Sequence, residues 1–221
     1  MIIAIDGKAG SGKTTISKIV AKKLSMVHVN TGAMYRAVTL YCIENSINVA
    51  DCHKLTTLSD SLNIEMRLDG KILLNGRDVT NHINTKNVTG KVSIYSAVPS
   101  IRKVLLEIQR NIVSNRDAVV EGRDIGTKVF PDAEIKFFFT ADIKTRAKRR
   151  QKDFLACGEK ITIESLIDDI KNRDYKDSNR NISPLKRSED AIVIDTTNVS
   201  INKQVNKLVK IIKNKKESLY G

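Results

Sequence analysis

The feature that most constrains this chain is a glycine-rich segment near the N-terminus, between an apolar run and a stretch with helical periodicity. Residues 7–14 read Gly-Lys-Ala-Gly-Ser-Gly-Lys-Thr and fit the pattern GxxxxGK[ST] without exception. The apolar run 2–5 predicts a strand before it, and residues 13–24 predict a helix after it. A glycine-rich loop in this context is typical of an α/β fold that binds phosphate through backbone N–H groups and the helix N-terminus.

The residue types in this loop suit a nucleoside triphosphate. The glycines let consecutive N–H groups face the phosphates, and Lys13 is expected to reach the β- and γ-phosphates. The Thr14 hydroxyl is expected to help to hold Mg²⁺, with water and phosphate completing the shell. The motif predicts ATP or GTP and says nothing of a second substrate. The predicted triphosphate-binding residues are Gly7, Lys8, Ala9, Gly10, Ser11, Gly12, Lys13, Thr14 and Thr15.

Apolar runs and helix-length stretches alternate along the rest of the chain. Runs that predict strands occur at 2–5, 27–29, 118–120, 135–139 and 191–194. Stretches that predict helices occur at 13–24, 33–45, 99–115, 142–156, 162–175 and 201–213. This alternation predicts an α/β fold with a five-stranded parallel sheet flanked by helices. Ligands of such sheets bind beyond the carboxyl ends of the strands.

One segment breaks this alternation. Residues 63–80 show alternating apolar positions and two turn signals, Asp69-Gly70 and Asn75-Gly76. The pattern predicts a small antiparallel meander. We interpret it as an insert on the α/β core and not as a separate domain.

Composition excludes several classes of protein. With 41% hydrophobic and 29% charged residues, the 221-residue chain is ordinary for a globular protein with a buried core. The N-terminus lacks the features of a signal peptide, and no apolar run approaches the roughly 20 residues of a membrane span. Cys42, Cys52 and Cys157 show no CxxC spacing, which excludes a four-cysteine zinc lid. We therefore expect a cytoplasmic protein with reduced thiols and no membrane partner.

The net charge of +13 has two explanations, nucleic-acid binding or a phosphate-rich active site on a lysine-rich surface. The C-terminal lysines are typical of a solvated helix face. These are Lys203, Lys207, Lys210, Lys213, Lys215 and Lys216. The arginines instead follow strands or lie in turns, and an arginine fork matches phosphate oxygens in a bidentate way. We assign the arginines to function and the lysine tail to the surface.

Two classes of nucleotide-binding protein fit poorly. A GTPase needs a guanine-reading NKxD after a late strand, and the nearest candidate, Asn214–Glu217, has no strand before it. A motor or switch ATPase ends a strand with a metal-organising acid, and Asp195 lies far along the chain for that role. Phosphoryl transfer itself needs mainly charge stabilisation and in-line positioning, which arginines provide.

Further blocks give the chain a family resemblance. Residues 30–36 (Asn-Thr-Gly-Ala-Met-Tyr-Arg), 121–127 (Glu-Gly-Arg-Asp-Ile-Gly-Thr) and 173–185 are similar to signature blocks of the bacterial cytidylate kinase family, as are 129–133 and 190–197. The resemblance runs in unbroken order from residue 2 to about residue 200. Three positions depart from the family pattern. Lys8 replaces a usual proline, and Asn30 and Glu121 each replace a common aspartate.

The resemblance implies a P-loop nucleotide kinase with a single kinase unit over 1–221. It implies a core of 1–30, 97–145 and 166–221, a monophosphate-binding region with the antiparallel insert at 31–96, and a short helical lid at 146–165. The implied activity is transfer of the γ-phosphate of ATP, with Mg²⁺, to CMP or dCMP. The implied partners are these small molecules alone, with no nucleic acid, and the implied state is a monomer.

The resemblance also implies roles for single residues. Arg36 and Arg123 are expected to clamp the acceptor phosphate, and Asp124, Arg102 and Ser93 to read the cytosine edge. The catalytic residues implied are Lys13, Arg36, Arg123, Arg146, Arg150 and Arg173. The acceptor-binding residues implied are Thr31, Tyr35, Arg36, Ser93, Arg102, Arg123, Asp124, Arg173, Asp177 and Arg180. No general base is expected, because the attacking phosphate oxygen is already largely ionised at neutral pH, and the three histidines are expected to be structural.

Two alternatives remain open at this stage. Within the same class, the acceptor would be UMP or AMP. From another class, the chain would be a P-loop protein that binds nucleic acid, although 5% aromatic residues and no tryptophan give it little material for base stacking.

Overall fold

The computed structural model describes residues 1–58, 62–67, 70–156 and 158–220 of the chain. These residues form two compact units. The first unit comprises Met1–His28, Arg116–Asn179 and Ser183–Gly221, and the second comprises Val29–Asn115 and Arg180–Ile182. The predicted thiol of Cys157 and the Asp69 half of one predicted turn lie outside the described residues.

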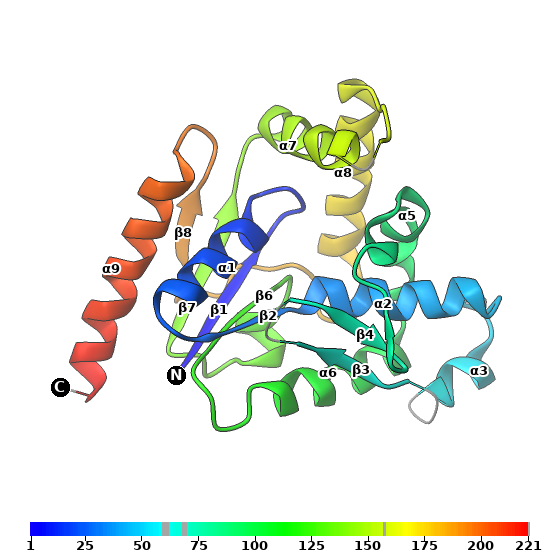
Figure 1. The fold of residues 1–221 in the computed structure, drawn as a ribbon, viewed down its shortest axis with the longest axis horizontal. Coiled ribbons are helices and arrows are strands. Elements are labelled where there is room, and N and C mark those ends of the chain that lie inside the picture. The colour runs from blue at the N-terminus through cyan, green and yellow to red at the C-terminus, as the bar shows by residue number, and fades with distance from the viewer. Residues whose placement is uncertain (59–61, 68–69, 157, 221) are drawn as a thin grey trace. The chain divides into compact units, whose positions relative to one another are not determined.

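The five-stranded sheet is the centre of the first unit (Figure 1). Its strands are β1 (Ile2–Gly7), β2 (Val27–Asn30), β6 (Ala118–Gly122), β7 (Ile135–Thr140) and β8 (Ile192–Asp195), in the order β2-β6-β1-β7-β8. β1 pairs in parallel with β6 and β7, and β7 pairs in parallel with β8. All five strands lie where the apolar runs predicted them, and the predicted fold class is confirmed.

The central strands are apolar because both faces of the sheet are covered. Every residue of β6 is buried, and so are the last five of β1. Helices α1 (Lys13–Lys23) and α9 (Ile201–Tyr220) contact each other and bury Ile16, Val20 and Leu208 in one core with the strands (Figure 1). The sheet therefore gives the loop after β1 a rigid support.

Helices α7 (Ile143–Ala156) and α8 (Ile163–Asn179) form a second packed pair in this unit. Their small core contains Ala147, Phe154, Leu166 and Ile170. Between β6 and β7 the chain makes one short π-helical turn, η2 (Ile125–Val129), which sequence periodicity did not predict.

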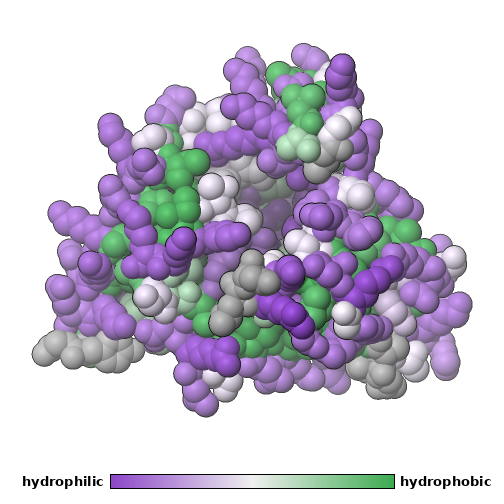
Figure 2. Space-filling model, viewed as in Figure 1, coloured by the Kyte–Doolittle hydropathy of each residue, from purple (hydrophilic) through white to green (hydrophobic). Residues whose placement is uncertain are grey.

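Apolar side chains are exposed on the edge strand β8 and around the start of α9. They are Ile192 and Val193 on β8, Val199 in the connection, and Ile201 at the start of α9. Figure 2 shows this apolar surface over β8 and the start of α9. The lysines of α9 are exposed as well, as expected for a solvated helix face.

The second unit holds helices α2 (Thr31–Glu44), α3 (Cys52–Thr56), α5 (Lys86–Tyr95) and α6 (Pro99–Ile112), with a short 3-10 turn η1 (His82–Asn84). α2 packs against α5 and α6. The contacts of α6 place it in this unit. The family resemblance had instead implied that residues 97–115 belong to the core. The division into core, acceptor region and lid stays a prediction.

The predicted meander is confirmed. Strands β3 (Ile64–Met66), β4 (Ile72–Leu74) and β5 (Arg77–Asp78) form an antiparallel sheet. Asn75 and Gly76 have φ values of 49° and 79°, and they connect the paired residues Leu74 and Arg77. Two consecutive positive φ values are typical of the Asn-Gly hairpin turn, which explains why the sequence signal was reliable.

Candidate active site

The glycine-rich loop connects β1 to α1 in a conformation that requires glycine at two positions. A Cβ at Gly7 would lie 2.2 Å from the carbonyl oxygen of Phe139, and Gly7 has a φ of 149°. Gly10 has a φ of 71°, and a Cβ there would lie 3.2 Å from the Arg146 carbonyl oxygen. The loop is therefore held closely between β7 and α7.

Lys13 is the first residue of α1 and is buried. Its Nζ donates hydrogen bonds to the carbonyl oxygens of Gly7 and Lys8, each at 2.8 Å. Burial lowers the pKa of Lys13 well below its ordinary value; Arg123 and Arg173 lower it as well, whereas Glu121 and Asp6 raise it. Two guanidinium groups thus lie near Lys13 beside the loop, and an anion bound there would favour the charged form of Lys13.

Thr14 contacts an acid that sequence reasoning had noted only as a departure from a family pattern. Its Oγ1 donates to Oε2 of Glu121 at 2.9 Å, and Glu121 is buried at the end of β6. Oε1 of Glu121 lies 3.1 Å from Nε2 of His28, which also lies 3.0 Å from Oγ of Ser17. The signal for this residue was an acid that ends a buried strand.

The Thr14 region suits Mg²⁺ in its donor chemistry. The Thr14 hydroxyl donates its hydrogen bond to Glu121, which leaves the lone pairs of the hydroxyl oxygen available to a cation. Hydroxyl and carboxylate oxygens are the donors that Mg²⁺ prefers, and phosphates and water complete its shell. Within the described ranges there is no cluster of three His, Cys, Asp or Glu side chains that would hold a metal without a nucleotide.

Arg123 follows β6 and pairs with an acid on α8. Its Nε donates to Oδ2 of Asp177 at 2.9 Å, and both side chains are largely buried. The main-chain carbonyl of Asp177 also accepts the N–H of Leu185, at 2.8 Å, which fixes the end of α8. Arg123 and Asp177 are both predicted acceptor-binding residues. They lie 54 positions apart in the chain and are in direct contact.

The arginines of α7 reach the loop from the other side. Arg146 is buried, pairs with Asp174 of α8 and donates to the Ala9 carbonyl oxygen at 3.3 Å. Arg149 donates to Oγ1 of Thr196 at 2.9 Å and to the Gly10 carbonyl oxygen at 3.4 Å. Arg150, predicted to act with Arg146, instead has its guanidinium 4.5 Å from the ring centre of Phe154 on its own helix. Arg149 was one of the candidate arginines in the sequence but was given no role in the site, although its spacing of three from Arg146 places both on one helix face.

Of the other predicted acceptor-binding residues, Asp124 and Arg173 belong to the first unit, and the remaining ones belong to the second. Thr31, Tyr35 and Arg36 are on α2, Ser93 is on α5, Arg102 is on α6, and Arg180 lies in the segment 180–182. The guanidinium of Arg102 lies 5.3 Å from the ring centre of Tyr35 and donates to the Ser96 carbonyl oxygen at 3.1 Å. Nη1 of Arg36 lies over Gly32, where a Cβ would be 3.4 Å away.

Asn30, one of the departures from the family pattern, has a structural role that the structure shows. Its side chain accepts the N–H of Ala33 at 3.0 Å and so caps the N-terminus of α2. Asparagine and aspartate cap helices about equally well. This departure therefore leaves the start of α2 intact.

A family model described as cytidylate kinase matches residues 3–214, which is nearly the whole described chain. This chain belongs to the cytidylate kinase family. The family prediction from the sequence blocks is confirmed.

Two relatives agree with membership of the cytidylate kinase family, and a solved structure shares the fold. The chain is 49% identical over 214 residues to the cytidylate kinase of Acholeplasma laidlawii, which covers 97% of this chain and 96% of that protein. It is 46% identical over 211 residues to the cytidylate kinase of Clostridium botulinum (strain Langeland), covering 96% and 97%. The crystal structure of a shikimate kinase from Bacteroides thetaiotaomicron, 12% identical, covers 96% of this chain and 98% of that one with a TM-score of 0.50, which shows a shared fold.

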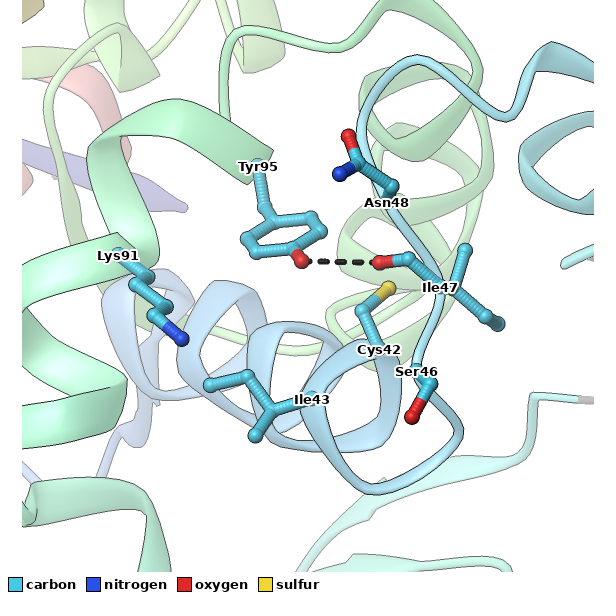
Figure 3. A pocket seen from close by; sticks show the side chains of 7 residues that line it. All are labelled: Cys42, Ile43, Ser46, Ile47, Asn48, Lys91 and Tyr95. Atoms are coloured by element: carbon cyan, nitrogen blue, oxygen red, sulfur yellow. Dashed lines mark hydrogen bonds between the residues drawn. The ribbon is translucent and has the colours of Figure 1, made fainter.

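This member of the cytidylate kinase family also has a small pocket in its second unit. It lies between α2, the loop after it and α5, and Tyr95 donates to the Ile47 carbonyl oxygen at 2.9 Å across it (Figure 3). Cys42 also lines it, and burial raises the pKa of its thiol to about 11, which makes it a poor nucleophile. None of the predicted site residues lines this pocket.

Asp6 supplies a testable pH dependence. Burial raises the pKa of Asp6 from 3.8 to about 6. A raised folded-state pKa gives stability that is fully present below 3.8 and is lost as pH rises through about 6. Because a shift of about two units corresponds to roughly 3 kcal/mol, we expect the free energy of unfolding of the wild type to fall by that amount, relative to D6N, between pH 4 and pH 7. Urea denaturation of both proteins measures this difference, and parallel profiles over that range would refute it.

Proposed function

We propose that this chain transfers the γ-phosphate of ATP to CMP or dCMP, giving CDP or dCDP. The observation that carries the proposal is a cluster of basic side chains at a phosphate-binding loop: Lys13 is buried against the Gly7 and Lys8 carbonyl oxygens, and Arg123 and Arg173 lie near it. Such a cluster suits the charge that develops during phosphoryl transfer. The acceptor comes from the relatives, which are named cytidylate kinase.

On the donor side, the loop amides and the N-terminus of α1 bind the triphosphate of ATP. Lys13 exchanges its contacts with the Gly7 and Lys8 carbonyl oxygens for phosphate oxygens, which restores the charge that burial disfavours. Mg²⁺, when bound with ATP, neutralises part of the phosphate charge. Thr14 would hold it, with Glu121 orienting the Thr14 hydroxyl.

On the acceptor side, we assign the clamping of the phosphate to Arg36 and Arg123, and we assign Arg173 to the transferring phosphate. Arg123 is already aimed by its ion pair with Asp177, so little side-chain freedom is lost when phosphate binds. The acceptor oxygen needs no general base, because a phosphate monoester is largely ionised at pH 7. The chain's task is positioning and charge stabilisation.

The base is recognised by its hydrogen-bonding edge. Cytosine presents an amine donor, a ring nitrogen acceptor and a carbonyl acceptor; an acid suits the first and an arginine suits the others. We assign the amine to Asp124, which is buried, and the acceptors to Arg102 and Ser93. Thr31, Tyr35 and Arg180 complete the proposed acceptor site.

Helix α7 carries the proposed lid. Arg146 and Arg150 are assigned to the γ-phosphate on closure, which also excludes water and so protects ATP from hydrolysis. Arg146 already touches the loop at Ala9. Arg150 would have to leave the face of Phe154.

The acceptor assignment predicts strong discrimination against uracil. Uracil has a carbonyl where cytosine has its amine, so it would meet Asp124 as acceptor against acceptor. A buried polar group left without a partner lowers kcat/KM by about 10⁴ in favourable cases. We expect CMP and dCMP to exceed UMP by at least about 10³ in kcat/KM, measured for purified protein in a coupled ADP-release assay. Equal turnover of UMP would contradict the assignment.

Three further expectations accompany this proposal: a cytoplasmic location, a monomeric state and no nucleic-acid partner. They stay predictions. In the part of the chain that is described, no helix has both the length and the apolar character needed to cross a bilayer.

A further inference from the structure

Asp6 is a buried carboxylate that the proposed reaction leaves without a role. It is the residue of β1 that directly precedes Gly7, the first residue of the phosphate-binding loop. Its Oδ1 accepts the main-chain N–H of Ile125 and its Oδ2 accepts that of Gly126, both at 2.8 Å. One side chain of β1 thus holds two consecutive amides that lie about 120 positions later in the chain.

Those two amides directly follow Asp124, the residue proposed to read cytosine. Asp124 itself has φ −142° and ψ 26°, outside the helical region, and precedes the π-helical turn η2. Its carbonyl oxygen accepts the N–H groups of Lys128 and Val129, at 2.9 and 3.2 Å. The backbone of Asp124 is therefore fixed on its carboxyl side by η2 and by the carboxylate of Asp6.

The space around this contact is closely filled. A Cβ at Gly126 would lie 3.0 Å from Cδ of Lys136 and 3.5 Å from Oδ2 of Asp6. Asp6 is only 5% exposed. Little room is left for water to replace the carboxylate if it were lost.

The ionised carboxylate of Asp6 is buried at a cost in free energy. Burial raises the pKa of Asp6 and the charge of Asp124 raises it too, although the two amides and Lys13 act in the opposite direction. The net rise means that the ionised carboxylate opposes folding at neutral pH. Local conflicts of this kind are typical of functional sites, where geometry matters more than stability.

We propose that Asp6 is a positioning residue that sets the direction of Asp124 and thereby the preference for cytosine over uracil. This inference rests on the proposed function, because it takes Asp124 as the reader of the base. Only a carboxylate supplies two acceptors in one plane. An asparagine would present an N–H group to one of the two amides, and that amide would be left without an acceptor.

The test compares D6N with the wild type and with D51N as a matched control. Asp51 also accepts a main-chain N–H, that of Lys54, but it caps the short helix α3 and takes no part in the proposed site. For each protein, kcat/KM is measured for CMP and for UMP, together with KM for ATP and the thermal midpoint. The affinities for CMP and UMP without ATP are measured by calorimetry.

For D6N we expect kcat/KM for CMP to fall about tenfold or more and the CMP-to-UMP ratio to fall by a similar factor, with KM for ATP changed less than about threefold. D51N should keep the wild-type ratio. If D6N does not fold, D6E serves in its place, since it keeps both acceptors but displaces them by one methylene.

Two outcomes would overturn parts of the account separately. An unchanged CMP-to-UMP ratio in a folded D6N protein, even with lower activity overall, would show a purely structural role for Asp6. A wild type that does not prefer CMP would refute the proposed function, and the role of Asp6 with it.

Discussion

Replacing Lys13 with alanine is expected to lower kcat with CMP by about 10³-fold or more. Removal of one preorganised donor from a phosphoryl or oxyanion site has effects of about 10²–10³. Lys13 also supports the loop through the Gly7 and Lys8 carbonyl oxygens, so the effect should reach the upper end of this range. Steady-state kinetics at saturating ATP and CMP measure it.

Lys18 offers the matched control for this variant. It lies on the same helix, α1, and is exposed. K18A should keep kcat within about twofold, because surface charges far from the reacting atoms contribute little. If K13A retained more than a tenth of the wild-type kcat, the loop would not be the donor site.

Replacing Arg123 with alanine is the second large effect. The substitution removes a proposed clamp on the acceptor phosphate and leaves Asp177, which is buried, without this ion pair. We expect kcat/KM for CMP to fall by about 10³, while KM for ATP changes less than about threefold. The difference between the effects on CMP and on ATP is the informative result. A collapse of the whole site would impair the use of CMP and also raise KM for ATP.

Arg116 is the control for Arg123. It is exposed in the turn that precedes β6, at the opposite end of the strand from Arg123. R116A should have the wild-type kcat/KM for CMP and the wild-type KM for ATP. Equal losses in R116A and R123A would point to a general effect of net charge and would contradict a specific clamp.

The elements that could be predicted from the sequence are those with strong local signals. The strand, loop and helix of residues 2–24 form a continuous pattern of apolar run, glycines and helical periodicity. The Asn75-Gly76 turn was equally clear, because few residue pairs other than Asn-Gly adopt two positive φ values easily. The site residues of the loop followed from the same motif.

The elements that were not predicted depend on tertiary contacts. Helix α5 contains Gly90 and several β-branched residues, which have low helix propensity, and its burial of Val88 and Val92 against the rest of its unit compensates for this. The π-helical turn η2 is only five residues long, too short for a periodic signal.

The contacts of Glu121 with Thr14 and of Asp6 with Ile125 join residues more than 100 positions apart. Nothing in a single sequence pairs such residues. The order of the strands explains them: β1 lies beside β6 in the sheet, so the residues that end both strands meet at one edge. Of the two acids, only Glu121 stood out beforehand, as a departure from the family pattern.

In the proposed reaction, a loop of backbone amides holds the donor nucleotide while several guanidinium groups align the acceptor phosphate with it. A crystal structure with CMP, ADP, Mg²⁺ and aluminium fluoride tests it most directly, because the fluoride complex mimics the transferring phosphoryl group. We expect Lys13 to contact the donor phosphates, and Arg36, Arg123 and Arg173 to lie within hydrogen-bonding distance of the CMP phosphate or the fluoride complex. Guanidinium groups directed to solvent, with CMP bound elsewhere, would contradict the account.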